Sequence, residues 1–358
     1  MAPRPQVDGQ PVVRTADNTN PPAARKGRSR IAWIEWLRAA GCVAIVALHV
    51  YVSLVNAAGV EALGATRVCV EGVLTVALTR WAVPCFLMVS GMLLLDPART
   101  VDARRIWGYV QRMLFVLATF GLLFCLIESV YDHGGLSLAV VGEAVWHLLT
   151  GRSWDHLWYV YAMLVLYLVT PLLRHLVARV SLTALGWGLG VAYLLVLVLP
   201  TVLWTRGISV SIPFNVVPAC FYYVLGWWVQ QRLRLGWSVW MAGLASLAAL
   251  VVTAAFGLDI LSLPEFCLVA PWSVLVLLLF REYATAPIEE HAVAATLASY
   301  SFGIYVVHPL FLHVITHLID PLMLPVGLYE LGAFAVALAG SVVTIALLRR
   351  IPAVRRYV

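Results

Sequence analysis

The chain has 358 residues, of which 62% are hydrophobic and only 12% charged, and its mean hydropathy is +0.90. These values exclude an ordinary soluble domain and predict an integral membrane protein whose surroundings are a lipid bilayer. The net charge of +6 comes from basic residues in short groups between apolar runs. That spacing is typical of topology signals, so nucleic acid is not an expected partner.

Residues 1–30 are rich in Pro, Arg and Asn and have no signal-peptide core, so they are expected to form a disordered cytoplasmic tail. Residues 31–348 form the predicted membrane domain, and residues 349–358 a basic cytoplasmic tail. Ten runs in the middle part are apolar enough to cross about 30 Å of hydrocarbon. They lie near 31–54, 68–95, 110–130, 157–174, 183–204, 213–231, 237–257, 260–280, 292–316 and 327–348.

Basic residues between these runs indicate the topology, because cytoplasmic loops are enriched in Lys and Arg. With a cytoplasmic N-terminus, only Arg67, Arg152 and Arg206 fall on the outer side. The sequence therefore predicts an all-α, multi-pass protein of the cell (inner or plasma) membrane, with about ten spans and both termini in the cytoplasm. The longest outer connection, 131–156, fits either a partly ordered cap or an ordinary solvated loop.

The first span carries Glu35, Arg38 and His49. Eleven helical steps separate Arg38 from His49, so both lie on one face, about 16 Å apart along the axis. Ionisable groups inside a span are usually functional, and Glu35 is placed for an i,i+3 ion pair with Arg38. A snorkelling Arg38 and a satisfied interior His49 are the structural alternatives.

The second span contains a further arginine, Arg80, at a depth close to that of Arg38, and two cations at one level could bind an anion. In the same span, Ser90 and Gly91 allow close approach of another helix, and packing is the simpler explanation of this pair.

Aromatic residues mark several later spans. The fourth span begins with His156, Trp158 and Tyr159, which fit the pattern of interfacial anchors. The ninth span adds His308, followed by His313 and His317. Only the last two have ligand spacing and no third ligand accompanies them, so no metal is expected. The six cysteines have no close pairing and fit small buried residues.

Together these segments resemble the acyltransferase 3 family of membrane acyltransferases, and within it the surface-polysaccharide O-acetyltransferases. Arg38, ten residues and His49 match the family's first-helix pattern, with Glu35 as its acidic residue. The pattern R-x-x-V-P-x-F-x-M-x-S-G matches from Arg80 to Gly91. Further similarity lies in the stretches HLWY, FYYVLGWW and YSFGIYVVHP. The chain departs at the family's R-x-x-R pair, where Tyr109 precedes Arg112, and Arg105 is the candidate substitute.

The resemblance implies transfer of acetyl from cytoplasmic acetyl-CoA to a glycan hydroxyl at or beyond the outer face. Arg38, Arg80, Arg112 and Arg105 are then the candidates for the phosphates of the donor. His49, with Arg38 and Glu35, is the catalytic candidate, either as a general base, which we favour, or as a nucleophile. Candidates for the substrate or oxyanion contacts are Ser90, Trp158, Tyr159, Ser301 and His308.

Two other classes of protein share part of this pattern. A secondary transporter or flippase for a polar solute or lipid-linked sugar also places Arg, Glu and His within the membrane. A membrane scaffold or sensor is the other class, but it does not explain why Arg38 and His49 lie on one face of the first span. The sequence carries no signal for the oligomeric state.

Overall fold

The computed structural model describes residues 31–208, 210, 215–255 and 267–357, and these residues form helices and connections without a β-strand. The predicted tail, 1–30, lies outside the described residues. From Ala32 onward the chain is one compact unit. The all-helical prediction is confirmed for this part of the chain.

Helices coincide with the ten predicted apolar runs, apart from the parts of the runs 213–231, 237–257 and 260–280 that lie outside the described residues. The α-helices are α1 (Ala32–Ala58), α2 (Val60–Leu63), α3 (Ala65–Thr79), α4 (Ala82–Leu94), α5 (Ala103–Val116), α6 (Leu122–His133), α7 (Leu138–Thr150), α8 (Trp158–Arg179), α9 (Leu182–Tyr193), α10 (Leu199–Thr205), α11 (Val216–Arg232), α12 (Trp237–Ala255), α13 (Val269–Tyr283), α14 (Ala292–Leu318) and α15 (Val326–Leu348). Wider turns, η1 (Leu117–Gly121) and η3 (Leu194–Val198), join α5 to α6 and α9 to α10.

Among the described residues, seven helical segments are long and apolar enough to span a membrane. They are Ala32–Ala58, Ala65–Leu94, Ala103–His133, Trp158–Arg179, Leu182–Thr205, Ala292–Leu318 and Val326–Leu348. The other three predicted spans correspond to α11, α12 and α13, and two of these, α11 and α13, have only 17 and 15 residues. The apolar helices thus make the chain a membrane protein.

The second span is interrupted at Arg80. Helix α3 ends at Thr79 and α4 begins at Ala82, with Pro84 in the first turn of α4. Proline has no N–H to donate and is tolerated in a first turn, where that hydrogen bond is not needed. The break therefore places Arg80 between two helical segments of one apolar stretch.

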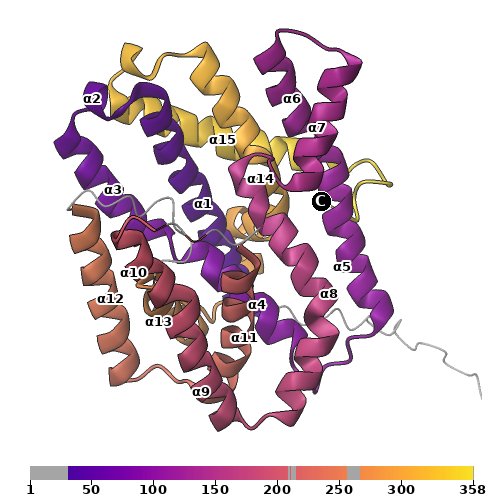
Figure 1. Cartoon of the computed structure of the whole chain (residues 1–358), viewed down its shortest axis with the longest axis vertical. Helices are drawn as coiled ribbons and strands as arrows, with labels where there is room; N and C mark the ends of the chain where they lie inside the picture. The colour runs from indigo at the N-terminus through magenta and orange to yellow at the C-terminus, as the bar shows by residue number, and fades with distance from the viewer. Residues whose placement is uncertain (1–30, 209, 211–214, 256–266, 358) are drawn as a thin grey trace, which may run out of the picture. The chain divides into compact units, whose positions relative to one another are not determined.

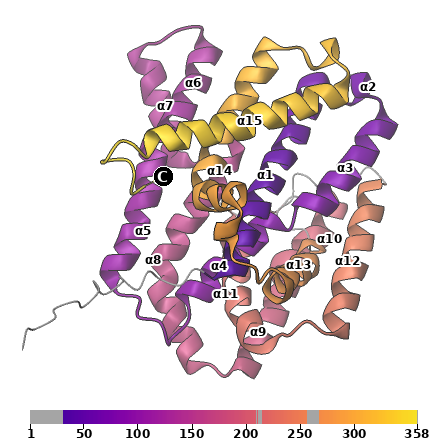
Figure 2. The same cartoon turned by 180° about the vertical axis from the view of Figure 1, so that it is seen from behind.

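The first helix, α1, lies side by side with α14, and α14 in turn packs on α15 (Figure 1). Viewed from behind, α15 crosses the same region, and the chain after it returns towards α5 (Figure 2). Because α1 and α14 are in contact along their lengths, polar residues on the facing sides of these helices meet at one interface.

Helices α4 and α11 approach each other through two glycines. A Cβ added to Gly91 would lie 1.7 Å from the carbonyl oxygen of Tyr223, and one added to Gly226 would lie 2.1 Å from that of Met88. No side chain fits at either position. The packing explanation of the Ser90–Gly91 pair is thus confirmed for Gly91.

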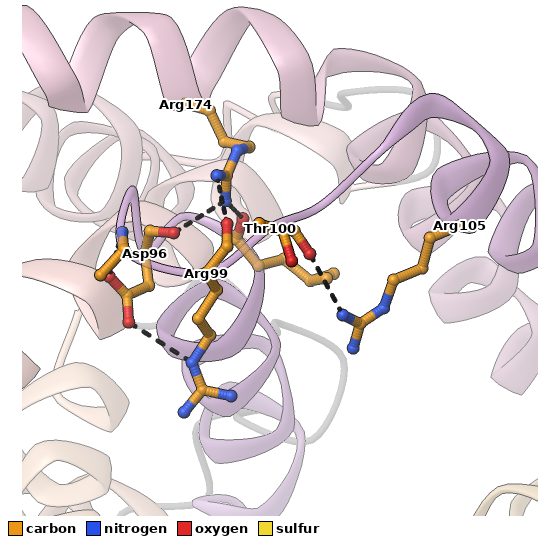
Figure 3. Close-up of polar contacts among 7 residues, drawn as sticks. Asp96, Arg99, Thr100, Arg105 and Arg174 are labelled. Carbon is orange, nitrogen blue, oxygen red and sulfur yellow. Dashed lines mark hydrogen bonds and ion pairs between the residues drawn. The ribbon is translucent and has the colours of Figure 1, made fainter.

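Arg174 of α8 fixes the end of α4. Its guanidinium donates to the carbonyl oxygens of Leu94 at 2.6 Å, Asp96 at 2.9 Å and Arg99 at 2.8 Å (Figure 3). Carbonyls at the end of a helix have no partner within the helix. Arg174 provides a donor for the carbonyl of Leu94 at the end of α4 and for two carbonyls in the following turn, and it thereby connects α8 to α4.

The long connection 131–156 is ordered. After α6, Gly134 adopts the left-handed conformation with φ 69°, and Ser137 caps α7 by accepting a hydrogen bond from the Val140 N–H at 3.3 Å. Helix α7 packs back on α6 as a hairpin. A single turn, η2 (Asp155–Leu157), then leads into α8. Of the two alternatives predicted for this connection, the structure therefore agrees with the partly ordered cap and not with the solvated loop.

Candidate active site

Two histidines meet at the interface of α1 and α14. The Nδ1 atom of His49 lies 3.1 Å from the Nε2 atom of His308, and the ring centroids are 4.9 Å apart. His308 is fully buried, whereas His49 is half-buried. The structure thus gives His49 a side-chain partner 259 positions away in the sequence.

Backbone contacts determine which ring nitrogens carry protons. The Nδ1 atom of His49 lies 2.9 Å from the carbonyl oxygen of Ile45, and Nδ1 of His308 lies 2.9 Å from that of Ile304. A carbonyl oxygen only accepts, so each Nδ1 carries the hydrogen. Nε2 of a neutral His308 then accepts from His49 Nδ1, and His49 keeps its lone pair on Nε2. With the hydrogen on Nδ1, the nitrogen of His49 that can act as a general base is Nε2.

A third histidine, His156, completes a cluster of rings. Its centroid lies 6.5 Å from that of His49 and 6.0 Å from that of His308. Its Nε2 atom lies 3.3 Å from the carbonyl oxygen of Val306, and its own carbonyl oxygen accepts from the Tyr305 hydroxyl. Burial, with a smaller effect of His49, lowers the pKa of His156 to about 3. The His156 ring is therefore neutral at physiological pH.

Sequence reasoning missed the place of His156, because aromatic residues at the start of a span are usually interfacial anchors. A signal existed in its position at the end of a connection that contains Trp154, which also packs against it. The η2 turn brings both residues to the histidine cluster.

Arg38 lies on the same α1–α14 interface as His49. Its Nη1 donates to Glu35 Oε1 at 3.1 Å, and its Nη2 donates to Ser301 Oγ at 3.1 Å. The predicted i,i+3 ion pair is confirmed. Ser301 and His308 are seven positions apart on α14, so one face of α14 receives both polar residues of α1.

Arg38 belongs to a cluster of three arginines. Arg112 of α5 interacts electrostatically with Arg38 and with Arg349, the residue that follows α15. Aromatic faces accept two of the cations: the Arg112 guanidinium lies 4.4 Å from the Phe302 ring, and that of Arg349 lies 4.3 Å from the Tyr300 ring. These three cations and the Glu35 carboxylate give the region a net positive charge suited to a phosphate.

The end of the chain also reaches Arg112. Its Nε donates to the carbonyl oxygen of Tyr357 at 2.9 Å, and the Tyr357 ring stacks on Phe115, with centroids 4.4 Å apart. The basic segment after α15 thus contributes to the surroundings of the arginine cluster. From the sequence it was expected only to form a basic cytoplasmic tail.

Arg105 and Arg80 have different surroundings. Arg105 Nε donates to the Tyr109 hydroxyl at 3.1 Å, and Tyr109 stacks on Tyr167 with centroids 5.1 Å apart. Because Arg112 interacts electrostatically with both tyrosines, Arg105 joins the arginine cluster through Tyr109. Arg80 interacts electrostatically with Tyr222 of α11.

Hydroxyl groups lie on another side of the site. Tyr159 of α8 forms a side-chain hydrogen bond with Ser90 and interacts electrostatically with Arg38. The ring of Tyr159 lies 5.3 Å from that of Tyr305. Trp158 packs edge-on against Tyr159 at 6.1 Å and supports its ring from the side.

Within the described part of the chain, no group of three or more His, Cys, Asp or Glu side chains could hold a metal ion. All six cysteines are free thiols, and three of them, Cys42, Cys85 and Cys125, are buried.

The acyltransferase 3 family, described as an acyltransferase domain, matches residues 31–348. The match covers nearly all of the chain and both helices that carry His49 and His308. The chain belongs to this family, and it is a membrane acyltransferase. Comparison with curated proteins and with solved structures gave no significant match.

Proposed function

We infer that this acyltransferase moves acetyl from cytoplasmic acetyl-CoA to a hydroxyl of a cell-surface or lipid-linked glycan, as the surface-polysaccharide O-acetyltransferases of the family do. One observation carries the proposal: His49, held by His308, shares the α1–α14 interface with Arg38. On this shared face, the Arg38 cation can bind a phosphate of the acyl donor, and His49 can act as the base for the hydroxyl of the acceptor.

The direction of this path follows from the proposed topology of ten spans with both termini in the cytoplasm. The excess of Lys and Arg in the loops on that side supports it. Arg38 then faces the cytoplasmic donor, whereas His49, about 16 Å further along α1, faces the acceptor. The enzyme thus acts in the inner or plasma membrane.

The donor is bound through its phosphates by Arg38 and Arg112, with Arg105 joined to them through Tyr109. Arginine presents two parallel N–H groups to phosphate oxygens and keeps its charge when partly buried. Arg349 is a further member of the set. Arg80, at the break between α3 and α4, remains a candidate for the same role.

The reaction begins with proton transfer. Nε2 of His49 takes the proton of the sugar hydroxyl while the oxygen attacks the carbonyl carbon of the thioester. The tetrahedral intermediate collapses as the C–S bond breaks, and coenzyme A leaves as a thiol after the imidazolium returns the proton. The products are the acetyl ester and coenzyme A.

His308 stabilises the imidazolium because its Nε2 accepts from His49 Nδ1, now a charged donor. Tyr159 is the hydroxyl candidate for donation to the oxyanion, because it lies close enough to Arg38 to interact with its charge. Ser90, whose Oγ donates to the carbonyl oxygen of Phe86 at 2.8 Å, would have to turn to take the same role. Ser301 and Trp158 have positioning roles through Arg38 and Tyr159.

The test uses purified protein in vesicles with acetyl-CoA labelled in the acetyl group and glycan released from the source cells. We expect label to enter the glycan as an ester, and His49→Ala to lower this transfer by about 10² to 10⁴. Full activity in His49→Ala would disprove the mechanism. Solute uptake without an acyl donor would favour the transporter, which no observation in the structure supports.

A further inference from the structure

A continuous series of aromatic rings leads away from the histidine cluster. It begins at His156 and continues to Trp154 at 6.3 Å, to His313 at 5.1 Å, to His317 at 4.2 Å and to Tyr131 at 5.5 Å, measured between ring centroids. We call these five residues the aromatic track. The rings come from η2 and the residues before it, from α14 and from α6, so the fold rather than one helix assembles them.

The aromatic track is buried at one end and open at the other. His156 is 5% exposed and Tyr131 is 68% exposed, while Trp154 and His313 are half-buried and His317 is exposed. Aromatic residues that only fill a core would all be buried, whereas exposure rises along the track from His156 to Tyr131. This gradient is the form expected of a binding surface that ends at a reactive group.

The middle of the track is held rigidly. Trp154 stacks on Phe124 of α6 with centroids 4.5 Å apart and the ring planes 6° from parallel. Phe124 itself is fully buried. A fixed ring loses little conformational freedom when a ligand packs on it, which favours binding.

The chemistry of the track suits a chain of sugars. A sugar ring has an apolar C–H face that packs on an aromatic ring and hydroxyls at its edge that hydrogen-bond to imidazole and phenol groups. An acyl chain, in contrast, would be matched by aliphatic side chains. The combination of Trp and Tyr with His along the track offers both kinds of contact.

A role as a proton path fits less well. Nδ1 of His317 lies 2.8 Å from the backbone carbonyl oxygen of His313, so this nitrogen donates to the backbone. Trp154, between His156 and His313, has a donor but no acceptor nitrogen and cannot relay a proton. The series is continuous in ring contacts but interrupted for proton exchange.

We propose that the aromatic track binds the acceptor glycan and leads it to His49. This inference rests on the proposed function and specifies the substrate at the same site: an oligosaccharide of several residues rather than a single sugar. Tyr131 and His317 bind the outer sugars, and Trp154 the sugar closest to the one that is acylated.

The experiment compares Tyr131→Ala and His317→Ala with the unchanged full chain in lipid nanodiscs, because both side chains are exposed and their loss leaves the core intact. Glycan released from the source cells is separated into oligosaccharide and monosaccharide fractions. We expect each variant to raise the KM for the oligosaccharide about fivefold, in line with the loss of one ring contact. The KM for acetyl-CoA and the rate with monosaccharides stay unchanged.

Two control variants sharpen the result. Tyr131→Phe keeps the ring and should retain most of the oligosaccharide affinity. Tyr283→Ala removes a ring of similar exposure, 70%, at the end of α13, outside the track, and should have no effect. An unchanged oligosaccharide KM in both track variants overturns the inference, as does a shift of the pH profile of kcat without a change in KM.

Direct binding separates this inference from the proposed function. If the unchanged protein acylates no glycan fraction, the proposed function fails. Equilibrium dialysis with labelled oligosaccharides then still decides whether Tyr131→Ala and His317→Ala weaken binding. The same measurement with the lipid extract of the source membranes distinguishes a lipid-linked glycan from a free one.

Discussion

His49 and His308, from helices at opposite ends of the chain, are joined through Nδ1 of the first and Nε2 of the second at 3.1 Å. Since each Nδ1 also lies near the carbonyl oxygen four residues before it, the tautomers of the two rings are set together. His308 acts on the reaction through His49 and is a positioning residue. Its removal therefore has a signature different from the removal of His49.

We expect His308→Phe to lower kcat by about tenfold to a hundredfold, less than the about 10² to 10⁴ lost in His49→Ala. The phenyl ring fills the buried space but no longer accepts from His49 Nδ1, so the imidazolium loses its partner. The pH profile of kcat should also shift, while the KM for acetyl-CoA does not change. A variant with reduced kcat and an unshifted profile would point to a purely structural role.

Arg112→Gln should raise the KM for acetyl-CoA by about tenfold or more, because a hydrogen bond to a charged group contributes about 1.5–3 kcal/mol. Initial rates over a range of donor concentrations measure this. Arg179→Gln, which removes an exposed cation at the end of α8, is the matched control and should leave the KM unchanged. Equal effects in the two variants would contradict a specific phosphate contact.

Gly91→Ala and Gly226→Ala should each lower the free energy of unfolding by about 1–3 kcal/mol or more, since the added methyl group meets backbone atoms that cannot move aside. Gly188→Ala provides the comparison: a Cβ at Gly188 of α9 meets nothing within 4 Å, and it should be neutral or slightly stabilising. Thermal melting in detergent measures all three. Equal melting temperatures for Gly91→Ala and Gly188→Ala would rule out the close contact.

The pH dependence of stability should contain a contribution from His156. Its pKa in the folded protein is lowered by burial from 6.5 to about 3, so the folded state binds fewer protons than the unfolded state between these values. The contribution of His156 to stability is complete above about pH 6.5 and is lost as the pH falls towards 3.

Melting temperatures of the purified protein across this range check the sign. In His156→Gln, the melting temperature should depend less steeply on pH, because about one proton fewer is taken up on unfolding. Replacement of the exposed His175 of α8 is the control and should leave the slope unchanged. The same slope in His156→Gln and in the unchanged protein would mean that His156 is not buried as a neutral ring.

The sequence was most informative where one helix carried the whole pattern. The shared face of Arg38 and His49 and the ion pair with Glu35 follow from helical periodicity alone, and both are found on α1. The apolar runs likewise predicted the positions of the helices. These features depend on local geometry, which a single sequence contains.

Contacts between distant segments could not be predicted in the same way. The bond from Arg112 to Tyr357 joins residues 245 positions apart, and no periodicity indicates it. His156 matched a frequent pattern of interfacial aromatics, and only the turn between α7 and α8 shows that it faces His308. The electrostatic interactions of Arg38 with Arg112 and with Arg349 likewise join distant segments, and no periodicity indicates them.

The glycine contact between α4 and α11 has a mechanical consequence. Two helices that touch through their backbones can neither slide nor rotate past each other without separating, so they move as one body. Among the described elements, α6 and α7 pack mainly against each other, and α6 also packs against η1. Flexing during turnover should therefore concentrate at the turn of the α6–α7 hairpin, where Tyr131 contacts His317, whereas the buried Phe124 keeps Trp154 in place. A glycan chain could then enter and leave at this end without displacing the reacting groups.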